Sequence, residues 1–139
     1  MNSTQLMEYW RSVLKNPTGI QSTDEFAVAI GKVLKVVFSR TLKSIDWESA
    51  KLAKRDLKEE VLELKQQPGK DIFAGSPSMI VQLTNLNLVD EYQICVHPVI
   101  AGSGLPLFKN INEKIAFKLL KTKTFGSGAV ILYYEPLKK

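Results

Sequence analysis

The sequence predicts an α/β fold in which strands and helices alternate along most of the chain and an antiparallel pair of strands closes it. Segments whose apolar residues recur every three or four positions, as on one face of a helix, alternate with short apolar runs typical of buried strands. Turns that contain Gly and Pro separate these segments. The last third of the chain holds strand-like segments, which favours an antiparallel pair at one edge of a layered sheet.

The N-terminal part of the chain is predicted to contain two helices and a strand. Residues 5–14 form the first helix, which ends before a turn that contains Pro and Gly. Thr23 is expected to cap the N-terminus of the second helix, because the acidic side chain of Asp24 follows in its first turn. Residues 35–39 contain a Val-Val-Phe run and are therefore predicted to form a buried strand.

The clearest helical pattern lies in the middle of the chain. After a brief extended piece at residues 51–53, Leu57, Val61 and Leu64 recur at intervals of four and three, opposite a charged face. This helix is expected to end at the Pro-Gly pair of residues 68–69.

The rest of the chain is predicted to supply further strands. Residues 71–74 are expected to form a strand, and the turn at residues 75–78 leads into another helix. In residues 91–100 apolar and other side chains alternate with the period of a strand. Residues 116–125 and 129–135, joined by a Gly-Ser-Gly turn, are predicted to pair as a hairpin.

Length and composition fit one globular domain over residues 1–139. The chain is long enough to bury most of its apolar surface around one core, and 45% of its residues are hydrophobic and 24% charged. No apolar run approaches the roughly 18 residues of a membrane span, so we expect no membrane partner. The N-terminus lacks the basic and apolar segments of a secretory signal, which predicts a cytoplasmic location.

The net charge of +5 agrees better with small phosphorylated ligands than with nucleic acid. Acidic residues are mixed among the basic ones, and no basic tract is interleaved with aromatic residues, so no nucleic-acid partner is expected. No cluster of His, Cys, Asp or Glu has the spacing of metal ligands, which predicts no metal. Cys95, the one cysteine, is interpreted as a core residue, and His97, the one histidine, as non-catalytic.

Polar residues stand where two of the predicted strands end. Ser39, Arg40 and Thr41 end the first strand, and Gly75 follows the strand predicted at residues 71–74. If these strands are parallel neighbours, both groups emerge at the same edge of the sheet, where ligands of open α/β sheets bind. A guanidinium fork suits phosphate oxygens, and a glycine followed by a helix N-terminus suits the pyrophosphate of a dinucleotide. The alternative is a polar strand end and an ordinary helix start, because neither stretch is a G-x-G-x-x-G or P-loop motif.

Four segments carry a resemblance to a known family. They are KVVFSRTL, LKQQPGKDIFAGSPSMIVQL, LVDEYQICVHPVIAGSGLPLF and KTKTFGSGAVILYYEP. In order and spacing they resemble the dihydrofolate-reductase-like family that includes the C-terminal reductase domain of the bifunctional riboflavin-biosynthesis deaminase/reductase and its stand-alone bacterial relatives. The resemblance runs from about residue 24 to residue 136. It implies a mixed sheet flanked by helices and hydride transfer from NADPH to a pterin- or pyrimidine-like ring.

The resemblance also assigns expected roles to individual residues. Ser39 and Arg40 fall where the family holds the adenosine ribose and its 2′-phosphate, with Thr41 beside them. The loop that contains Gly102 and Gly104 falls near the substrate side. The residues expected to face the cofactor's pyrophosphate are Gly75, Ser76, Ser78 and Met79.

One departure from the family pattern lies at the N-terminus. The family opens with an apolar strand and a Leu-Asp-Gly-like segment, and residues 1–23 do not resemble it. The expected domain is therefore N-terminally short, and its exposed sheet edges predict a homodimer through residues 91–100 and 129–135. The alternative to a working reductase is a non-catalytic nucleotide-binding or structural relative in which hydride transfer is slow or absent.

Overall fold

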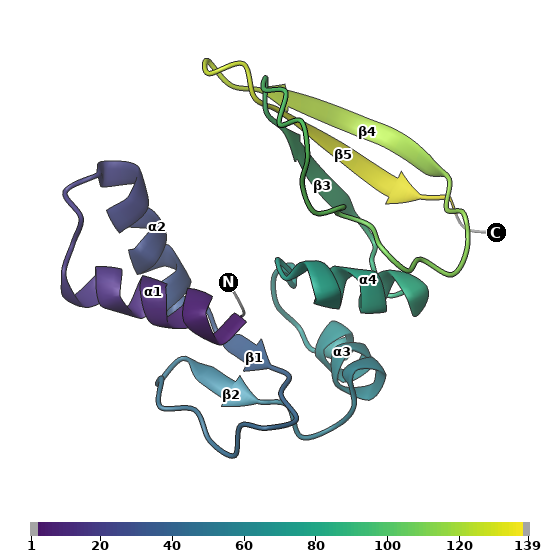
Figure 1. The fold of residues 1–139 in the computed structure, drawn as a ribbon. Helices are drawn as coiled ribbons and strands as arrows, with labels where there is room; N and C mark the ends of the chain where they lie inside the picture. Colours follow the sequence, from purple (N-terminus) through teal and green to yellow (C-terminus); the bar gives the residue numbers. More distant parts are fainter. Residues whose placement is uncertain (1–2, 138–139) are drawn as a thin grey trace. The chain divides into compact units, whose positions relative to one another are not determined.

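The computed structural model describes residues 3–137, and the chain divides into two compact units. The first unit ends at Glu60 and the second begins at Val61. Each unit contains its own small sheet (Figure 1). Among the described residues, no helix has the length and apolar character needed to cross a membrane.

Two packed helices begin the first unit. They are α1 (Ser3–Lys15) and α2 (Gln21–Lys32), and Val13 and Ala27 are buried. A Cβ atom at Gly31 would lie only 2.9 Å from Leu14 Cδ1, so the absence of a side chain at Gly31 is what permits the close approach of the two helices. Both predicted helices are confirmed.

The predicted cap of α2 is wrong. Ile20, not Thr23, is the N-cap residue, and it makes no side-chain capping bond. The stabilising contact comes from inside the helix instead. The Asp24 carboxylate accepts hydrogen bonds from the backbone N–H and the hydroxyl of Thr18, each at 2.8 Å, and from the Gly19 N–H at 3.0 Å.

A pair of short parallel strands completes the sheet of the first unit. β1 (Lys35–Val37) lies beside β2 (Ala50–Leu52), with Val36 opposite Lys51. The strand predicted at residues 35–39 is confirmed but shorter, and the extended piece at 51–53 overlaps β2. The strand predicted at residues 71–74 is not formed. It has no neighbouring strand to share backbone hydrogen bonds, and Phe73 within it is 85% exposed.

Two helices follow the parallel strands. α3 (Leu57–Gln66) begins after Asp56, whose Oδ1 accepts the Glu59 N–H at 2.9 Å as an N-cap. α4 (Pro77–Asn85) begins with Pro at its first turn, where a missing N–H costs no helical hydrogen bond. Both helices match their predicted positions.

The sheet of the second unit is antiparallel, in the order β3-β5-β4 (Figure 1). Its strands are β3 (Tyr92–Val96), β4 (Phe117–Thr124) and β5 (Val130–Pro136). β4 and β5 form the predicted hairpin. A bulge interrupts β4, because Leu119 pairs with Tyr134 but Lys121 pairs with Tyr133, which leaves one extra residue in β4.

The core of the second unit gathers on one face of this sheet. Tyr92 is buried, and its ring packs against Phe108 and Phe117 with centroids 6.0 and 4.8 Å away. Cys95 is three positions from Tyr92 along β3, so its side chain lies on the other face of the sheet, where it is exposed. Its interpretation as a core residue is therefore wrong. The physical reason is that alternate side chains of a strand point to opposite faces, and the Tyr92 face is the packed one.

Candidate functional site

The turn after β1 is ordered around the side chain of Ser39. Its Oγ accepts hydrogen bonds from the backbone N–H groups of Thr41 at 3.3 Å and Leu42 at 3.1 Å, and lies 3.4 Å from the Thr41 hydroxyl. This local hydrogen bonding folds the chain back after the strand. Arg40 stands exposed on the turn, and its guanidinium has no hydrogen-bond or ion-pair partner among residues 3–137.

The end of β2 lies beside the end of β1, which sequence reasoning missed. The Ala53 N–H donates to the Val37 carbonyl at 2.9 Å, so the parallel pairing continues one step past β2. Lys54 and Arg55 follow directly and are exposed. Arg55 lies 3.9 Å from the Glu60 carboxylate. The sequence does hold a signal for this basic site: Lys54 and Arg55 stand between a predicted extended piece and Asp56, which caps the next helix.

The second group of predicted residues begins α4. Ser76 is the N-cap residue, and its hydroxyl lies 3.2 Å from that of Ser78 rather than on a helix N–H. The first N–H groups of a helix lack acceptors within the helix, which makes such an end suitable for an anion. Pro77 removes one of these donors. Met79 is half-buried in the first turn.

Gly75 immediately precedes this helix start. A Cβ atom at Gly75 would meet only the edge of the Phe73 ring, at 3.4 Å, and the Gly75 φ is not positive. Packing and backbone conformation therefore do not require glycine here. The structure places Ser39, Arg40 and Thr41 together on one turn of the first unit, and Gly75, Ser76, Ser78 and Met79 together in the second. A phosphate site shared by both groups stays a prediction.

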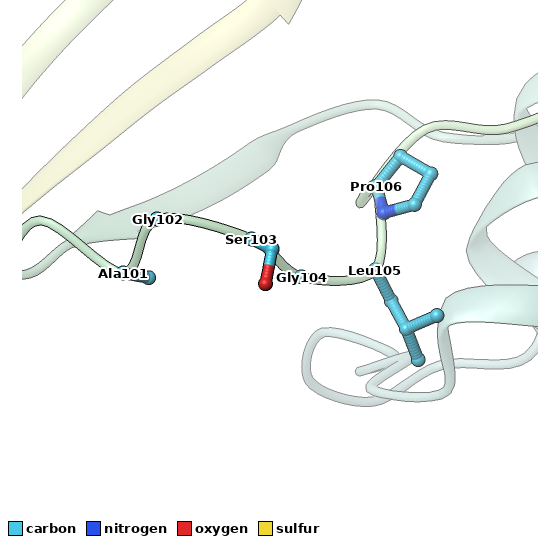
Figure 2. Close-up of a pocket in the computed structure, with 6 residues that line it drawn as sticks. All are labelled: Ala101, Gly102, Ser103, Gly104, Leu105 and Pro106. Atoms are coloured by element: carbon cyan, nitrogen blue, oxygen red, sulfur yellow. The ribbon is translucent and has the colours of Figure 1, made fainter.

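The loop after β3 contains the two glycines predicted near the substrate. Residues 101–106 line a shallow, open depression of about 410 Å³, along which Gly102 and Gly104 flank Ser103 (Figure 2). Gly102 has φ +75°, a conformation that other residues rarely adopt. The lining offers backbone groups and the Ser103 hydroxyl, with no ionisable side chain. It can therefore position a ligand but supplies no acid or base.

An amide clamp fixes the far end of this loop. The Asn85 side chain donates to the Asn110 carbonyl at 3.0 Å and accepts the Asn112 N–H at 3.0 Å. The clamp ties the loop to the last residue of α4, and Asn110 itself has φ +62°. The predicted substrate loop thus has one fixed end.

Lys35 has a perturbed pKa but serves a structural role. Burial lowers the pKa of its ammonium group. The ammonium donates to the Val33 carbonyl at 2.6 Å and the Ser49 hydroxyl at 2.7 Å, and lies 4.3 Å from the Trp47 ring centroid. These contacts hold the end of α2 against the start of β2. Lys35 is at the opposite end of β1 from Arg40, away from the candidate site.

Comparison with known proteins identifies the family. Residues 13–131 match the family model of the RibD C-terminal domain. The chain belongs to the RibD C-terminal domain family. The resemblance recognised in the sequence is thereby confirmed, and family membership suggests a nucleotide cofactor.

Two Bacillus subtilis proteins are similar to this RibD C-terminal domain. YyaP is 45% identical over 102 residues, which are 73% of this chain and 54% of YyaP. YwjB is 39% identical over 72 residues, which are 51% of this chain and 41% of YwjB. The chain therefore spans about half the length of the curated relatives it matches.

Solved structures confirm the α/β fold of this RibD C-terminal domain. A riboflavin biosynthesis protein candidate from Shewanella sp. PV-4 aligns with TM-score 0.65 and 17% identity, covering 93% of this chain and 87% of that one. A pyrimidine reductase-like protein from Corynebacterium diphtheriae aligns with TM-score 0.50 and 16% identity, covering 75% of this chain and 50% of that one. The chain therefore shares its fold with these two proteins.

Proposed function

We propose that this chain is an NADPH-dependent reductase that transfers hydride to a pterin- or pyrimidine-like ring, and that the turn after β1 holds the 2′-phosphate of the cofactor. The observation that carries the proposal is the Arg40 guanidinium, which has no partner among residues 3–137 and stands on a turn already ordered by Ser39. Because hydrogen bonds to Ser39 Oγ already order that turn, little ordering entropy opposes phosphate binding.

The donor chemistry around Arg40 fits a phosphate. Residues 38–45 contain Arg40, Lys43 and the hydroxyls of Ser39, Thr41 and Ser44, and no carboxylate. Lys54 adds a further positive charge at the end of the neighbouring strand. Arginine binds phosphate oxygens through two parallel N–H groups, and such charged hydrogen bonds are about twice as strong as neutral ones. The residues present therefore suit a 2′-phosphate better than a bare ribose hydroxyl.

Two other segments would bind the rest of the cofactor and the substrate. The start of α4, with Gly75 before it, would hold the pyrophosphate through backbone N–H groups. The loop at Gly102 and Gly104 would line the substrate side. When bound, the nicotinamide supplies the hydride, and the protein binds and orients the two reactants.

We also propose that the chain forms a homodimer through residues 91–100 and 129–135. Apolar side chains at the end of β3 and just beyond it support this proposal. Val96 is 50% exposed, Val99 73% and Ile100 fully exposed. Burying such side chains against a second copy removes apolar surface from water.

Thermal unfolding in the presence of nucleotides tests the cofactor proposal. A ligand that binds only the folded chain stabilises it by about 2.7 kcal/mol at 100 times its Kd. We expect NADPH to raise the Tm more than NADH at equal concentration, and adenosine 2′,5′-bisphosphate to raise it more than AMP. Equal shifts within each pair would contradict a 2′-phosphate site. Adenosine 2′,5′-bisphosphate and AMP differ only in the 2′-phosphate. Any difference between their Tm shifts therefore reports on the proposed 2′-phosphate site at the turn after β1.

A further inference from the structure

Glu60, in the first turn of α3, has a buried carboxylate with an oxygen that accepts no hydrogen bond. The residue is 7% exposed, and no donor among residues 3–137 reaches its Oε2. A buried carboxylate is costly unless a cation or a donor lies beside it. The cation beside Glu60 is Arg55, whose Nη1 lies 3.9 Å from Oε2. The charge of Glu60 therefore attracts the Arg55 guanidinium without taking a hydrogen bond from it.

The Arg55–Glu60 pair spans the start of α3. Asp56 caps the helix, so Arg55 stands one position before the cap and Glu60 is the fourth residue of the helix. Side chains at these two positions often pack against each other and fix the direction in which the chain enters a helix. Apolar residues usually make this contact, and here an ion pair makes it. The pair therefore holds Arg55 at the corner between β2 and α3.

This corner lies at the edge of the sheet from which Arg40 also emerges. β1 and β2 are parallel, and Val37 pairs with Leu52, so each arginine follows the last paired residue of its strand by three positions. The Ala53 N–H also donates to the Val37 carbonyl, which keeps the two chains side by side beyond β2. Figure 1 shows both strands pointing the same way. Arg40 and Arg55 thus leave the first sheet at the same edge.

The charges at this corner leave Arg55 able to bind an anion. Its side chain is 47% exposed although it lies against Glu60. The nearest other carboxylate, that of Asp56, accepts the Glu59 N–H as the helix cap. Lys54, directly before Arg55, is exposed and positively charged. A phosphate monoester carries a charge of about −1.5 to −2 at neutral pH, so one guanidinium does not balance it and a second one adds charged hydrogen bonds.

We propose that Arg55 is a second arginine of the 2′-phosphate site and that Glu60 positions it there. The inference rests on the proposed function, which assigns the 2′-phosphate to Arg40. Arg55 would bind the same phosphate from the corner before α3. Glu60 touches no ligand and acts through Arg55. Because NADH carries a hydroxyl in place of the 2′-phosphate, Arg55 determines cofactor specificity rather than affinity for nucleotides in general.

Calorimetric titration with adenosine 2′,5′-bisphosphate and with AMP tests the role of Arg55. The ratio of the two Kd values is the 2′-phosphate preference of the chain. Arg55→Ala should lower this preference by roughly tenfold, the effect of losing a hydrogen bond to a charged group, and Arg55→Lys should lower it less. Lys58→Ala is the control, because Lys58 is exposed in the first turn of α3 and carries the same charge. It should leave the preference nearly unchanged.

A double-variant cycle tests the positioning role of Glu60. Glu60→Gln keeps the size of the side chain and removes its charge, and it should lower the preference less than Arg55→Ala does. The double variant should lose no more than Arg55→Ala alone, because Glu60 acts only through Arg55. The double variant also avoids leaving the Glu60 charge buried without a cation, which could unfold Arg55→Ala. Circular dichroism establishes that each variant is folded.

The failures of this inference and of the proposed function are distinguishable. An unaltered chain without any preference for the bisphosphate would remove the 2′-phosphate site, and this inference with it. A preference that survives Arg55→Ala would leave the site standing and overturn the role of Arg55, as would an equal loss in Lys58→Ala. Additive losses in the double variant would show that Glu60 acts independently of Arg55 and would overturn its positioning role.

Discussion

Thr84 and Tyr92 share a buried hydrogen bond that ties α4 to β3. Their side-chain oxygens lie 2.9 Å apart, and the residues are only 3% and 6% exposed. Because the Tyr92 ring also packs against Phe108 and Phe117, this bond fixes the start of β3 relative to the core. Neither hydroxyl can turn to water if its partner is removed.

Replacing Thr84 by Val should therefore destabilise the fold. The Tyr92 hydroxyl would remain buried without a partner, at a cost of about 1–3 kcal/mol. Urea unfolding measures the change. The double variant Thr84→Val with Tyr92→Phe should lose less than the sum of the two single variants, since it removes both polar groups. Strict additivity would contradict a direct interaction.

Asp24 should contribute to stability in a pH-dependent way. Hydrogen bonds from Thr18, first from its backbone N–H and then from its hydroxyl, lower the pKa of Asp24 below the ordinary value of 3.8, with a further contribution from Gly19. A lowered pKa in the folded state gives stability that is present above pH 3.8 and lost as the pH falls through the folded pKa. In Asp24→Asn, the free energy of unfolding should therefore fall less steeply as the pH is lowered below about 4.

The matched control for Asp24 is Glu25→Gln. Glu25 lies next to it on α2, and its carboxylate accepts one hydrogen bond, from the neutral Gln21 amide at 2.8 Å. Urea midpoints measured from pH 7 down to pH 3 should show a reduced slope in Asp24→Asn only. A similar reduction in both variants would indicate general charge effects rather than the Thr18 contacts.

Arg40→Ala should weaken NADPH binding by roughly 1.5–3 kcal/mol, the range for a hydrogen bond to a charged group, and leave NADH little changed. Fluorescence titration of each cofactor measures the difference. Lys15→Ala is the control, because Lys15 is exposed at the end of α1 and carries the same charge. Equal losses for both cofactors, or an equal effect of Lys15→Ala, would remove the 2′-phosphate role from Arg40.

Gly75→Val should abolish binding of NADPH and NADH alike, since a branched side chain blocks the backbone from the pyrophosphate. The fold should survive, because a Cβ atom at position 75 meets only Phe73 at 3.4 Å. Gly69→Val is the control, because the space around Gly69 is open and its φ is not positive. Unaltered titrations in folded Gly75→Val would exclude Gly75 from the site.

Local patterns predicted the helices and the hairpin well. The spacing of Leu57, Val61 and Leu64 lies within a few turns of one helix, and the Gly-Ser-Gly turn joins strands that are neighbours in sequence. The partner of β1 could not be found in this way. β1 and β2 are three residues each, too short to show a period, and parallel strands pair across a long connection.

Exposure and strand pairing also limited what could be predicted of the candidate site. Cys95 belongs to a period-two pattern in which both faces contain apolar residues, and only the packing of Tyr92 shows which face is buried. Arg40 was identified from its place after an apolar run. Lys54 was missed because its relation to Arg40 depends on the pairing of Val37 with Leu52.

The bulge in β4 makes one position of the chain unusually tolerant of deletion. Leu119 pairs with Tyr134 and Lys121 with Tyr133, so removing Leu120 would bring two consecutive partners together and leave an uninterrupted ladder. A one-residue deletion elsewhere in β4 would turn every side chain beyond it to the opposite face. Shortened homologues are therefore expected to carry their gap at this residue, where the loss changes the curvature of the hairpin but preserves its hydrogen-bonded pairs.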